Sequence, residues 1–381
     1  MYELDVGDPM RGTWVSKGGK NQNLQVIRGI AILLVLVVHV RALLLPGDAL
    51  YWDKLLTWVH PPVGVDLFFV LSGYLMGRIF LARADAQWPL LETSIFYRRR
   101  FSRLIPAAFF WAVVTFVLGL TLAGRAGFLD QRDAFWKFFT SLTFLRNFEQ
   151  ASAPDILGYY WSLSVEAQFY ILLPLAWFGL RRWFWPFVIG LLALSVVWRF
   201  GGDVAWLFRY DGLLVGLLVW KITSVTDWRR FTAPVLPQRR WMAVAVLWFA
   251  AIAMAALPQA LPDFSGLAYL ALSLIGGYLV LMGLALPDGS LGVTRWDRGA
   301  VAWMGEISYS VYLVHIPFFM VANLALSRYR IDPGIAGYLG VILVMLAISY
   351  LSYRFIEPLM ADSTRKAIQQ ATQLEGRSSA P

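Results

Sequence analysis

The sequence predicts an all-α integral membrane protein, a bundle of about ten transmembrane helices with both termini in the cytoplasm. Composition gives the first reason. Of the 381 residues, 59% are apolar and only 15% are charged, which is too little charge to cover a soluble domain of this length. The second reason is that runs of about 20 mostly apolar residues, the length that crosses a bilayer, follow one another along the chain.

The apolar runs define the expected spans. They lie at residues 24–45, 63–82, 104–124, 160–180, 183–200, 203–220, 241–257, 266–286, 302–326 and 335–357. Arg209 and Asp211 interrupt the sixth run, and we expect them to form a structural ion pair. Close helix packing is predicted at two pairs of glycines four residues apart: Gly73 with Gly77, and Gly212 with Gly216.

The distribution of basic residues sets the expected orientation. With the N-terminus inside, the inside segments contain 20 Lys and Arg residues and the outside segments contain 8, as the positive-inside rule requires. These loops account for the net charge of +9, so no nucleic-acid partner is expected. The longest outside loop, about 125–159, is expected to contain an interfacial or re-entrant helix.

The expected organisation is one membrane domain between two short tails. We expect a cytoplasmic N-terminal tail at 1–23, a transmembrane domain at 24–358 and a cytoplasmic C-terminal tail at 359–381. The chain contains no cysteine and only three histidines, His39, His60 and His315. A thiolate or His-rich metal site is therefore not expected. His60 falls in an outside loop, and no role is assigned to it.

The first span carries an arginine and a histidine that share a helix face. Arg28 and His39 are 11 residues apart, which at 100° per residue is only about 20° from three full turns. Their side chains then stand about 16 Å apart along the helix axis. Ionisable groups inside spans are functional candidates. The alternative is an arginine that snorkels to the interface and a histidine that hydrogen-bonds within the bundle.

Three further ionisable residues are expected near the depth of His39. Counting turns from the span ends places Asp66, Glu166 and His315 in the outer third or half of the bilayer. A histidine near a carboxylate in a dry environment is a natural acid–base pair. For Asp66 and His315, a structural polar contact is the competing interpretation.

An arginine run precedes the third span. In RRRFSR, residues 98–103, Arg100 and Arg103 are three apart and share a helix face. They could bind an anionic phosphate as a fork. A positive-inside anchor is the simpler interpretation, and it is sufficient for Arg98 and Arg99.

Six segments, taken in order, resemble the acyltransferase family 3 membrane proteins over roughly residues 24–358. The first is the Arg28–His39 pair. The others are GVDLFFVLSGYLMGRIF (64–80), the RxxR of YRRRFSRLIP (Arg100 to Arg103), WSLSVEAQFYILLP (161–174), GEISYSVYLVHIPFF (305–319) and YRFIEP (353–358). One departure is Gln25, where many members carry an acidic residue. The fused extracytoplasmic esterase-like domain of some members is not expected in this chain.

The resemblance implies an O-acyltransferase of a bacterial cytoplasmic (inner) membrane, most often an O-acetyltransferase. The donor would be acetyl-CoA or another acyl-CoA, without a metal, and the acceptor a hydroxyl of an exported or lipid-linked saccharide. Apart from these substrates, membrane lipids are the expected partners. Arg28, Arg100 and Arg103 would bind the donor phosphates.

His39 would then act as general base with Glu166 in support, and Asp66, Ser72 and His315 would support the site or bind acceptor. A covalent acyl-His intermediate is a variant of this hypothesis. A proton-coupled transporter or acyl carrier is the alternative, because carriers also use intramembrane His, Asp and Glu. A catalytically silent partner of another enzyme is a third possibility.

Overall fold

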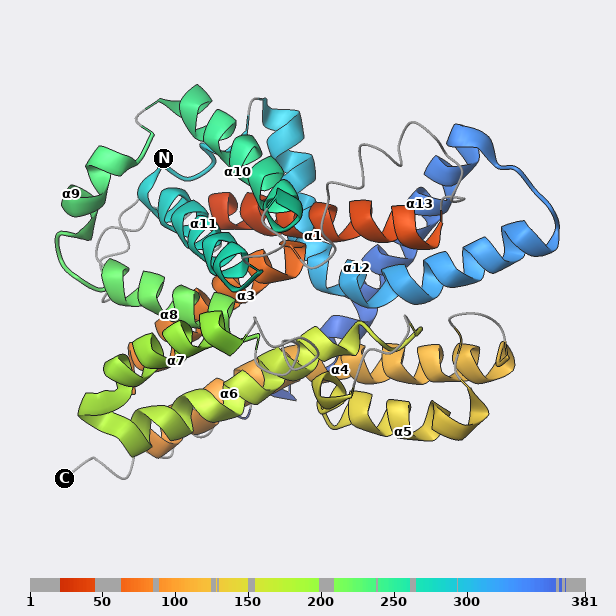
Figure 1. The fold of residues 1–381 in the computed structure, drawn as a ribbon, viewed down its shortest axis with the longest axis horizontal. Coiled ribbons are helices and arrows are strands. Elements are labelled where there is room, and N and C mark those ends of the chain that lie inside the picture. Colours follow the sequence, from red (N-terminus) through yellow and green to blue (C-terminus); the bar gives the residue numbers. More distant parts are fainter. Residues whose placement is uncertain are drawn as a thin grey trace. The chain divides into compact units, whose positions relative to one another are not determined.

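Every regular element in the described ranges is a helix, which confirms the predicted fold class (Figure 1). The structure is a computed structural model. It describes residues 21–44, 63–84, 89–124, 128, 130–149, 155–198, 209–237, 239–260, 265–292, 294–360, 363, 364 and 367. His60, residues 1–20 of the expected N-terminal tail and most of the expected C-terminal tail lie outside these ranges.

The long helices follow the expected apolar runs. They are α1 (Gln22–Leu43), α3 (Val63–Met76), α4 (Pro89–Thr121), α6 (Tyr160–Leu180), α7 (Phe184–Trp198), α8 (Asp211–Thr223), α10 (Arg240–Ala260), α11 (Ser265–Ala285), α12 (Arg295–Arg328) and α13 (Gly334–Leu351). The shorter elements are η1 (Gly77–Leu81), α5 (Gln131–Leu142), η2 (Arg146–Phe148), η3 (Arg181–Trp183), α9 (Trp228–Thr232), η5 (Ala233–Val235), η7 (Ser352–Ile356) and η8 (Glu357–Met360).

The chain divides into two compact units. Unit 1 comprises Met1–Arg78 and Leu180–Ser308, and unit 2 comprises Ile79–Gly179 and Tyr309–Pro381. Unit 1 therefore contains α1, α3, α7, α8, α10, α11 and the first part of α12. Unit 2 contains α4, α5, α6, the remainder of α12, and α13.

Unit 1 is built around α3 and α8, which pack against each other along their length, and both helices also pack on α11. The predicted glycine pairs lie between these two helices. A Cβ added at Gly73 would stand 2.1 Å from the backbone oxygen of Leu213, and one added at Gly216 would stand 2.2 Å from that of Val70. With a larger residue at either position, α3 and α8 could not approach each other so closely. The predicted close packing at small residues is therefore confirmed.

The start of α1 is fixed by polar contacts in the same unit. Asn21 caps the helix, because its side chain accepts a hydrogen bond from the Leu24 amide at 3.0 Å. Asn23 is buried and donates to the backbone oxygens of Gly283 at 3.1 Å and Pro287 at 3.0 Å. Residues 22 and 23, expected in the tail, therefore belong to the packed helix.

In unit 2, α4 and α6 run antiparallel. The Tyr97 hydroxyl donates to the Ile171 oxygen at 3.4 Å, and the Tyr160 hydroxyl donates to the Ala108 oxygen at 2.6 Å. Each pair is eleven residues apart on its own helix (97 to 108 and 160 to 171), so the two helices keep a constant register. Because α4 continues to Thr121, it extends well beyond the start of α6.

The extension of α4 is covered by the helix that was predicted in the loop 125–159. This helix, α5, packs on α4, and Phe138 stacks on Phe116 with ring centroids 4.3 Å apart. On α5, Phe135, Trp136 and Phe139 remain exposed. The prediction of a helix in this loop is therefore confirmed, whereas its position at a membrane interface stays a prediction.

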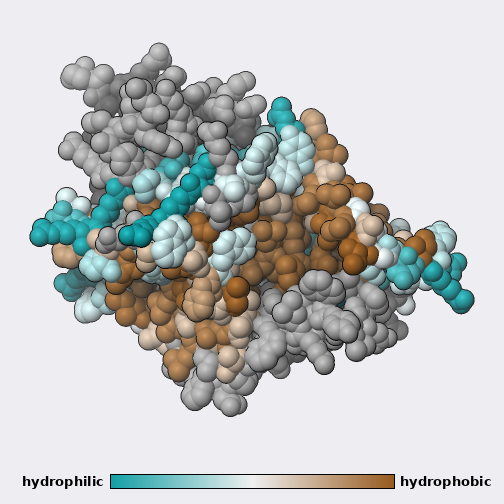
Figure 2. Space-filling model, turned by 90° about the horizontal axis from the view of Figure 1, so that it is seen from above, coloured by the Kyte–Doolittle hydropathy of each residue, from teal (hydrophilic) through white to brown (hydrophobic). Residues whose placement is uncertain are grey.

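Eight helical stretches in the described residues are long and apolar enough to cross a membrane. Large apolar side chains are exposed along them, for example Phe249 on α10 and Leu343 on α13. Figure 2 shows that hydrophobic residues cover much of the face drawn there. A soluble protein rarely exposes so much apolar surface, and the molecule is therefore a multi-pass membrane protein.

The spans differ from expectation in three places. The stretch Tyr160–Ser195 is one of the eight candidate membrane-crossing stretches, where the sequence predicted two spans. Within it, η3 separates α6 from α7, and Arg181 of η3 has a left-handed φ of 49°. Residues 203–208 of the sixth run lie outside the described ranges, and in its described part α8 begins at Asp211. The run RRRFSR lies inside the 33-residue helix α4, not before it. The count of ten spans and the orientation stay predictions.

Candidate active site

Arg28 and His39 lie on α1, which runs unbroken from Gln22 to Leu43. The helical spacing that places them on one face, about 16 Å apart along the axis, therefore applies. Arg28 donates from Nη2 to the Ser308 hydroxyl at 3.3 Å, and Ser308 in turn donates to the Gly305 oxygen at 2.8 Å. The Ser308 contact could not be read from the sequence, because it joins residues 280 positions apart.

The hydrogen bond of His39 defines which ring nitrogen can act as a base. Its Nδ1 lies 2.8 Å from the Val35 carbonyl oxygen. A carbonyl can only accept, so Nδ1 carries the proton. In the neutral imidazole the lone pair is then on Nε2, which suits this nitrogen to accept a proton from a hydroxyl.

Asp66 belongs to a buried network with Arg209 in unit 1. Arg209 donates from Nη2 to Asp66 Oδ1, and both side chains are almost completely buried. Asp211 also interacts electrostatically with Arg209, and it accepts a hydrogen bond from Ser273 at 2.9 Å. Arg209 thus forms an ion pair with Asp66, while Asp211, the partner expected from the sequence, acts on Arg209 electrostatically. This contact supports the structural interpretation of Asp66.

Ser72, predicted to support the site, is half-buried on α3. It follows Asp66 by six residues, and 600° of rotation puts the two side chains on different faces of the helix. Its supporting role stays a prediction.

Arg100 is the buried member of the arginine run. Its side chain is 7% exposed, and its Nε and Nη2 have no hydrogen-bond partner among the described residues. The guanidinium lies 5.6 Å from the ring centroid of Tyr170. The Tyr170 hydroxyl donates to Glu166 Oε1 at 2.8 Å, and the charges of Glu166 and Arg103 both act on Arg100. Arg103 itself is exposed.

Glu166 therefore lies at the level of the arginines in unit 2. Counting turns from the end of its span placed it in the outer half of the bilayer, on the opposite side from RRRFSR. That count measures depth along one span only, whereas α4 extends far beyond the start of α6. The four-residue spacing of Glu166 and Tyr170 on α6 was a signal that could have identified Tyr170 as a neighbour.

From Tyr309 onward, the GEISYSVYL segment meets the YRFIEP segment in unit 2. The Tyr309 hydroxyl donates to the Leu104 oxygen at 2.7 Å, and Arg103, Glu166 and Glu357 all act on it electrostatically. Glu357 accepts a hydrogen bond from Ser310 at 2.6 Å. The two C-terminal segments therefore border the Arg100–Glu166–Tyr170 cluster, which sequence spacing did not reveal.

His315 is completely buried in unit 2. Its Nδ1 lies 2.7 Å from the Tyr312 backbone oxygen, and its ring packs against Tyr159, Tyr312 and Phe319. These contacts fit the structural interpretation, and a supporting role stays a prediction. In the ranges that the structure describes, no group of three or more His, Asp or Glu side chains could hold a metal ion.

The fold and these side chains define a polytopic membrane protein that carries acid–base and cationic groups within its spans. The profile of the acyltransferase domain (acyltransferase family 3) matches residues 21–354. The chain belongs to this family of acyltransferases, as its motifs predicted.

Named relatives support the assignment. The peptidoglycan O-acetyltransferase OatA of Listeria monocytogenes is 27% identical over 87% of this chain and 54% of its own length. The O-acetyltransferase OatA of Staphylococcus aureus is 27% identical over 88% of this chain and 56% of its own length. The membrane-bound transacylase BcsY of Komagataeibacter xylinus is 29% identical over 96% of this chain and 92% of its own length. The chain thus spans about half the length of the OatA relatives. No solved structure matches it.

Proposed function

We propose that this protein is a membrane O-acetyltransferase that moves an acetyl group from acetyl-CoA to a hydroxyl of an exported or lipid-linked saccharide. The names of the OatA and BcsY relatives support the transfer chemistry and, for the Listeria protein, a peptidoglycan acceptor. The proposed location is a bacterial cytoplasmic membrane, with both termini inside. The family assignment favours this function over a proton-coupled carrier.

The observation that carries the donor proposal is the buried guanidinium of Arg100. Tyr170 and Glu166 compensate part of its charge, but its Nε and Nη2 lack hydrogen-bond partners among the described residues. Buried donors without partners are costly, and a bound anion removes that cost. Guanidinium groups match phosphate geometry, and coenzyme A carries several phosphate groups. We assign Arg100 as the buried phosphate ligand in unit 2, with the exposed Arg103 as an additional positive charge nearby. In unit 1 the proposed phosphate ligand is Arg28.

The proposed general base is His39 through Nε2. Nε2 removes the proton of the acceptor hydroxyl while that oxygen bonds to the thioester carbonyl carbon. The C–S bond then breaks, and the coenzyme A thiolate leaves with the proton from the imidazolium. The support of His39 by Glu166 stays a prediction from the sequence.

The test is acetyl-CoA binding and acetyl transfer by the purified full-length protein, in the wild type, His39→Ala and Arg28→Ala. We expect His39→Ala to bind acetyl-CoA normally but to lose transfer by about 10²- to 10⁴-fold. Arg28→Ala should weaken binding. Near-normal transfer by His39→Ala would remove this residue from the chemistry, and no saturable acetyl-CoA binding by folded wild type would refute the donor.

A further inference from the structure

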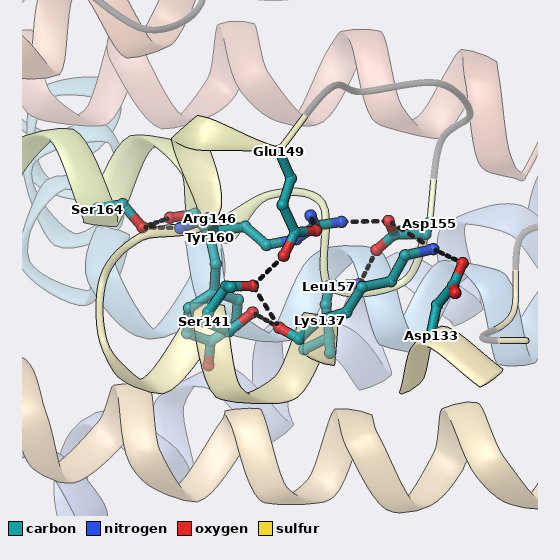
Figure 3. Close-up of polar contacts among 10 residues, drawn as sticks. Asp133, Lys137, Ser141, Arg146, Glu149, Asp155, Leu157, Tyr160 and Ser164 are labelled. Atoms are coloured by element: carbon teal, nitrogen blue, oxygen red, sulfur yellow. Dashed lines mark hydrogen bonds and ion pairs between the residues drawn. The ribbon is translucent and has the colours of Figure 1, made fainter. Parts of the chain in front are cut away.

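The segment that follows α5 is held in place by a buried charge network. Figure 3 shows the Arg146 side chain extending between Glu149 and Asp155, and it forms ion pairs with both. Asp155 also accepts from the Leu157 amide at 2.8 Å, just before α6 begins. Burial lowers the pKa of Arg146, and the Asp155 carboxylate opposes this shift. Glu149 also accepts from the Thr140 hydroxyl of α5, so residues 144–149, the α5–α6 connector, are fixed to the chain on either side.

The connector also bonds directly to one face of α6. Gln168 donates from Nε2 to the Phe144 oxygen at 2.7 Å and to Asn147 Oδ1 at 2.8 Å. Asn147 donates back to Gln168 Oε1 at 3.3 Å, and the Arg146 amide donates to the Ser164 hydroxyl at 3.2 Å. Phe144 adopts a left-handed φ of 55°, which is costly for a non-glycine residue. The strained residue, Phe144, is the one whose carbonyl oxygen accepts the hydrogen bond from Gln168.

Helix geometry relates these contacts to the arginine cluster. Ser164 and Gln168 are four residues apart and share one face of α6, and so do Glu166 and Tyr170. The two faces differ by about 200°, so they lie on opposite sides of the same turns. The connector holds one side while the other presents Glu166 and Tyr170 to Arg100. A rotation of α6 by about 10° would move side-chain atoms at its surface by on the order of 1 Å.

We propose that Gln168 is a positioning residue, which fixes the rotation of α6 through Asn147 and Phe144 so that Tyr170 and Glu166 hold the Arg100 guanidinium ready for the donor. This inference rests on the proposed role of Arg100 as a phosphate ligand. Displacements of about 1 Å in a binding site are enough to lower its efficiency strongly.

Two readouts test the proposal in the full-length protein. The first is acetyl-CoA affinity in a double-mutant cycle of Gln168→Ala and Arg100→Met. When Gln168→Ala is made in the wild-type protein, we expect the Kd for acetyl-CoA to rise by about tenfold. When it is made in the Arg100→Met variant, we expect a rise of less than about twofold, because Gln168 acts on binding only by positioning Arg100. Thr143→Ala is the matched control. It removes a hydrogen bond at the end of α5, from the Thr143 hydroxyl to the Phe139 oxygen, and should leave the Kd unchanged.

The second readout is independent of ligand and exploits the absence of cysteine. Spin labels on Phe109→Cys of α4 and Leu172→Cys of α6, both exposed, report the α4–α6 distance. We expect Gln168→Ala to shift or broaden this distance distribution and Thr143→Ala to leave it unchanged. Asn147→Ser removes the same amide pair from the connector side and replaces Gln168→Ala if that variant does not fold.

Each outcome decides one question. An unchanged distance distribution in Gln168→Ala overturns the positioning role, whatever happens to binding. Additive effects of Gln168→Ala and Arg100→Met on the Kd also overturn it. If the distribution changes but Arg100→Met binds acetyl-CoA normally, α6 positioning is supported and the proposed donor site at Arg100 is refuted.

Discussion

Two buried arginines, Arg209 in unit 1 and Arg100 in unit 2, are compensated in different ways. Arg209 forms an ion pair with Asp66, and the nearby Asp211 adds a second carboxylate. Arg100 lies over the Tyr170 ring and has two N–H groups without hydrogen-bond partners among the described residues. Both arginine residues are nearly inaccessible, Arg209 at 3% and Arg100 at 7% exposure.

This difference distinguishes an arginine whose charge is paired within the fold from an arginine whose donors remain available for a ligand. A buried arginine with a carboxylate partner is compensated within the protein, and removing either partner leaves an uncompensated buried charge. A buried arginine whose donors lack partners stores a desolvation cost that an anionic ligand can remove. Sequence position could not distinguish the two, since both arginines lie in or beside apolar runs.

The largest effect is expected from breaking the Arg209–Asp66 pair. Arg209→Met leaves the Asp66 carboxylate buried without its ion-pair partner and should destabilise the protein by about 3–5 kcal/mol. The measurement is denaturant unfolding of the detergent-solubilised protein. The double variant Arg209→Met with Asp66→Asn should recover much of this loss, because it removes both charges. If the single variant is as stable as the wild type, the pair has no structural role and the comparison fails.

Arg100→Met is expected to have a smaller effect, and the effect is on the affinity for acetyl-CoA and not on stability. Loss of charge-assisted hydrogen bonds, each worth about 1.5–3 kcal/mol, should raise the Kd for acetyl-CoA by about 10- to 100-fold. Stability in the absence of donor should stay the same or increase, because no buried carboxylate loses an ion pair. Binding isotherms and unfolding curves of the same preparations separate the two quantities.

The control for Arg100 is Arg98, an exposed arginine of the same run. It is two residues away, on the opposite side of α4, and Arg98→Met should bind acetyl-CoA like the wild type. Equal weakening by both variants would indicate a general effect of charge and would contradict a specific role for Arg100.

The sequence predicted the fold class and several local features correctly. Apolar runs of membrane length defined most helices, because lipid requires each span to satisfy its own backbone hydrogen bonds. Glycine spacing predicted close helix packing at Gly73 and Gly216, which lie where α3 and α8 meet. The spacing of Arg28 and His39 could be read because α1 is unbroken.

Relative depth could not be predicted in the same way. Glu166 was placed by counting from the end of an apolar run, but helix length and register are set by tertiary contacts. The Tyr160–Ala108 hydrogen bond places the first residue of α6 beside Ala108, and α4 continues past this point to Thr121. The predicted environment of Arg209 was also incomplete. Its ion-pair partner Asp66 is 143 residues away, and no local sequence pattern connects the two.

The smallest effect is expected at Arg103, which the sequence paired with Arg100 but which is exposed in the structure. An exposed charge contributes little, so Arg103→Gln should raise the Kd for acetyl-CoA by at most about fivefold. The Debye length falls from about 10 Å at 0.1 M salt to about 3 Å at 1 M. The Arg103→Gln effect should therefore disappear at 1 M salt, whereas the Arg100→Met effect should persist because its site is buried. A salt-resistant loss in Arg103→Gln, equal to that of Arg100→Met, would mean that both arginines bind the donor as the fork that the sequence suggested.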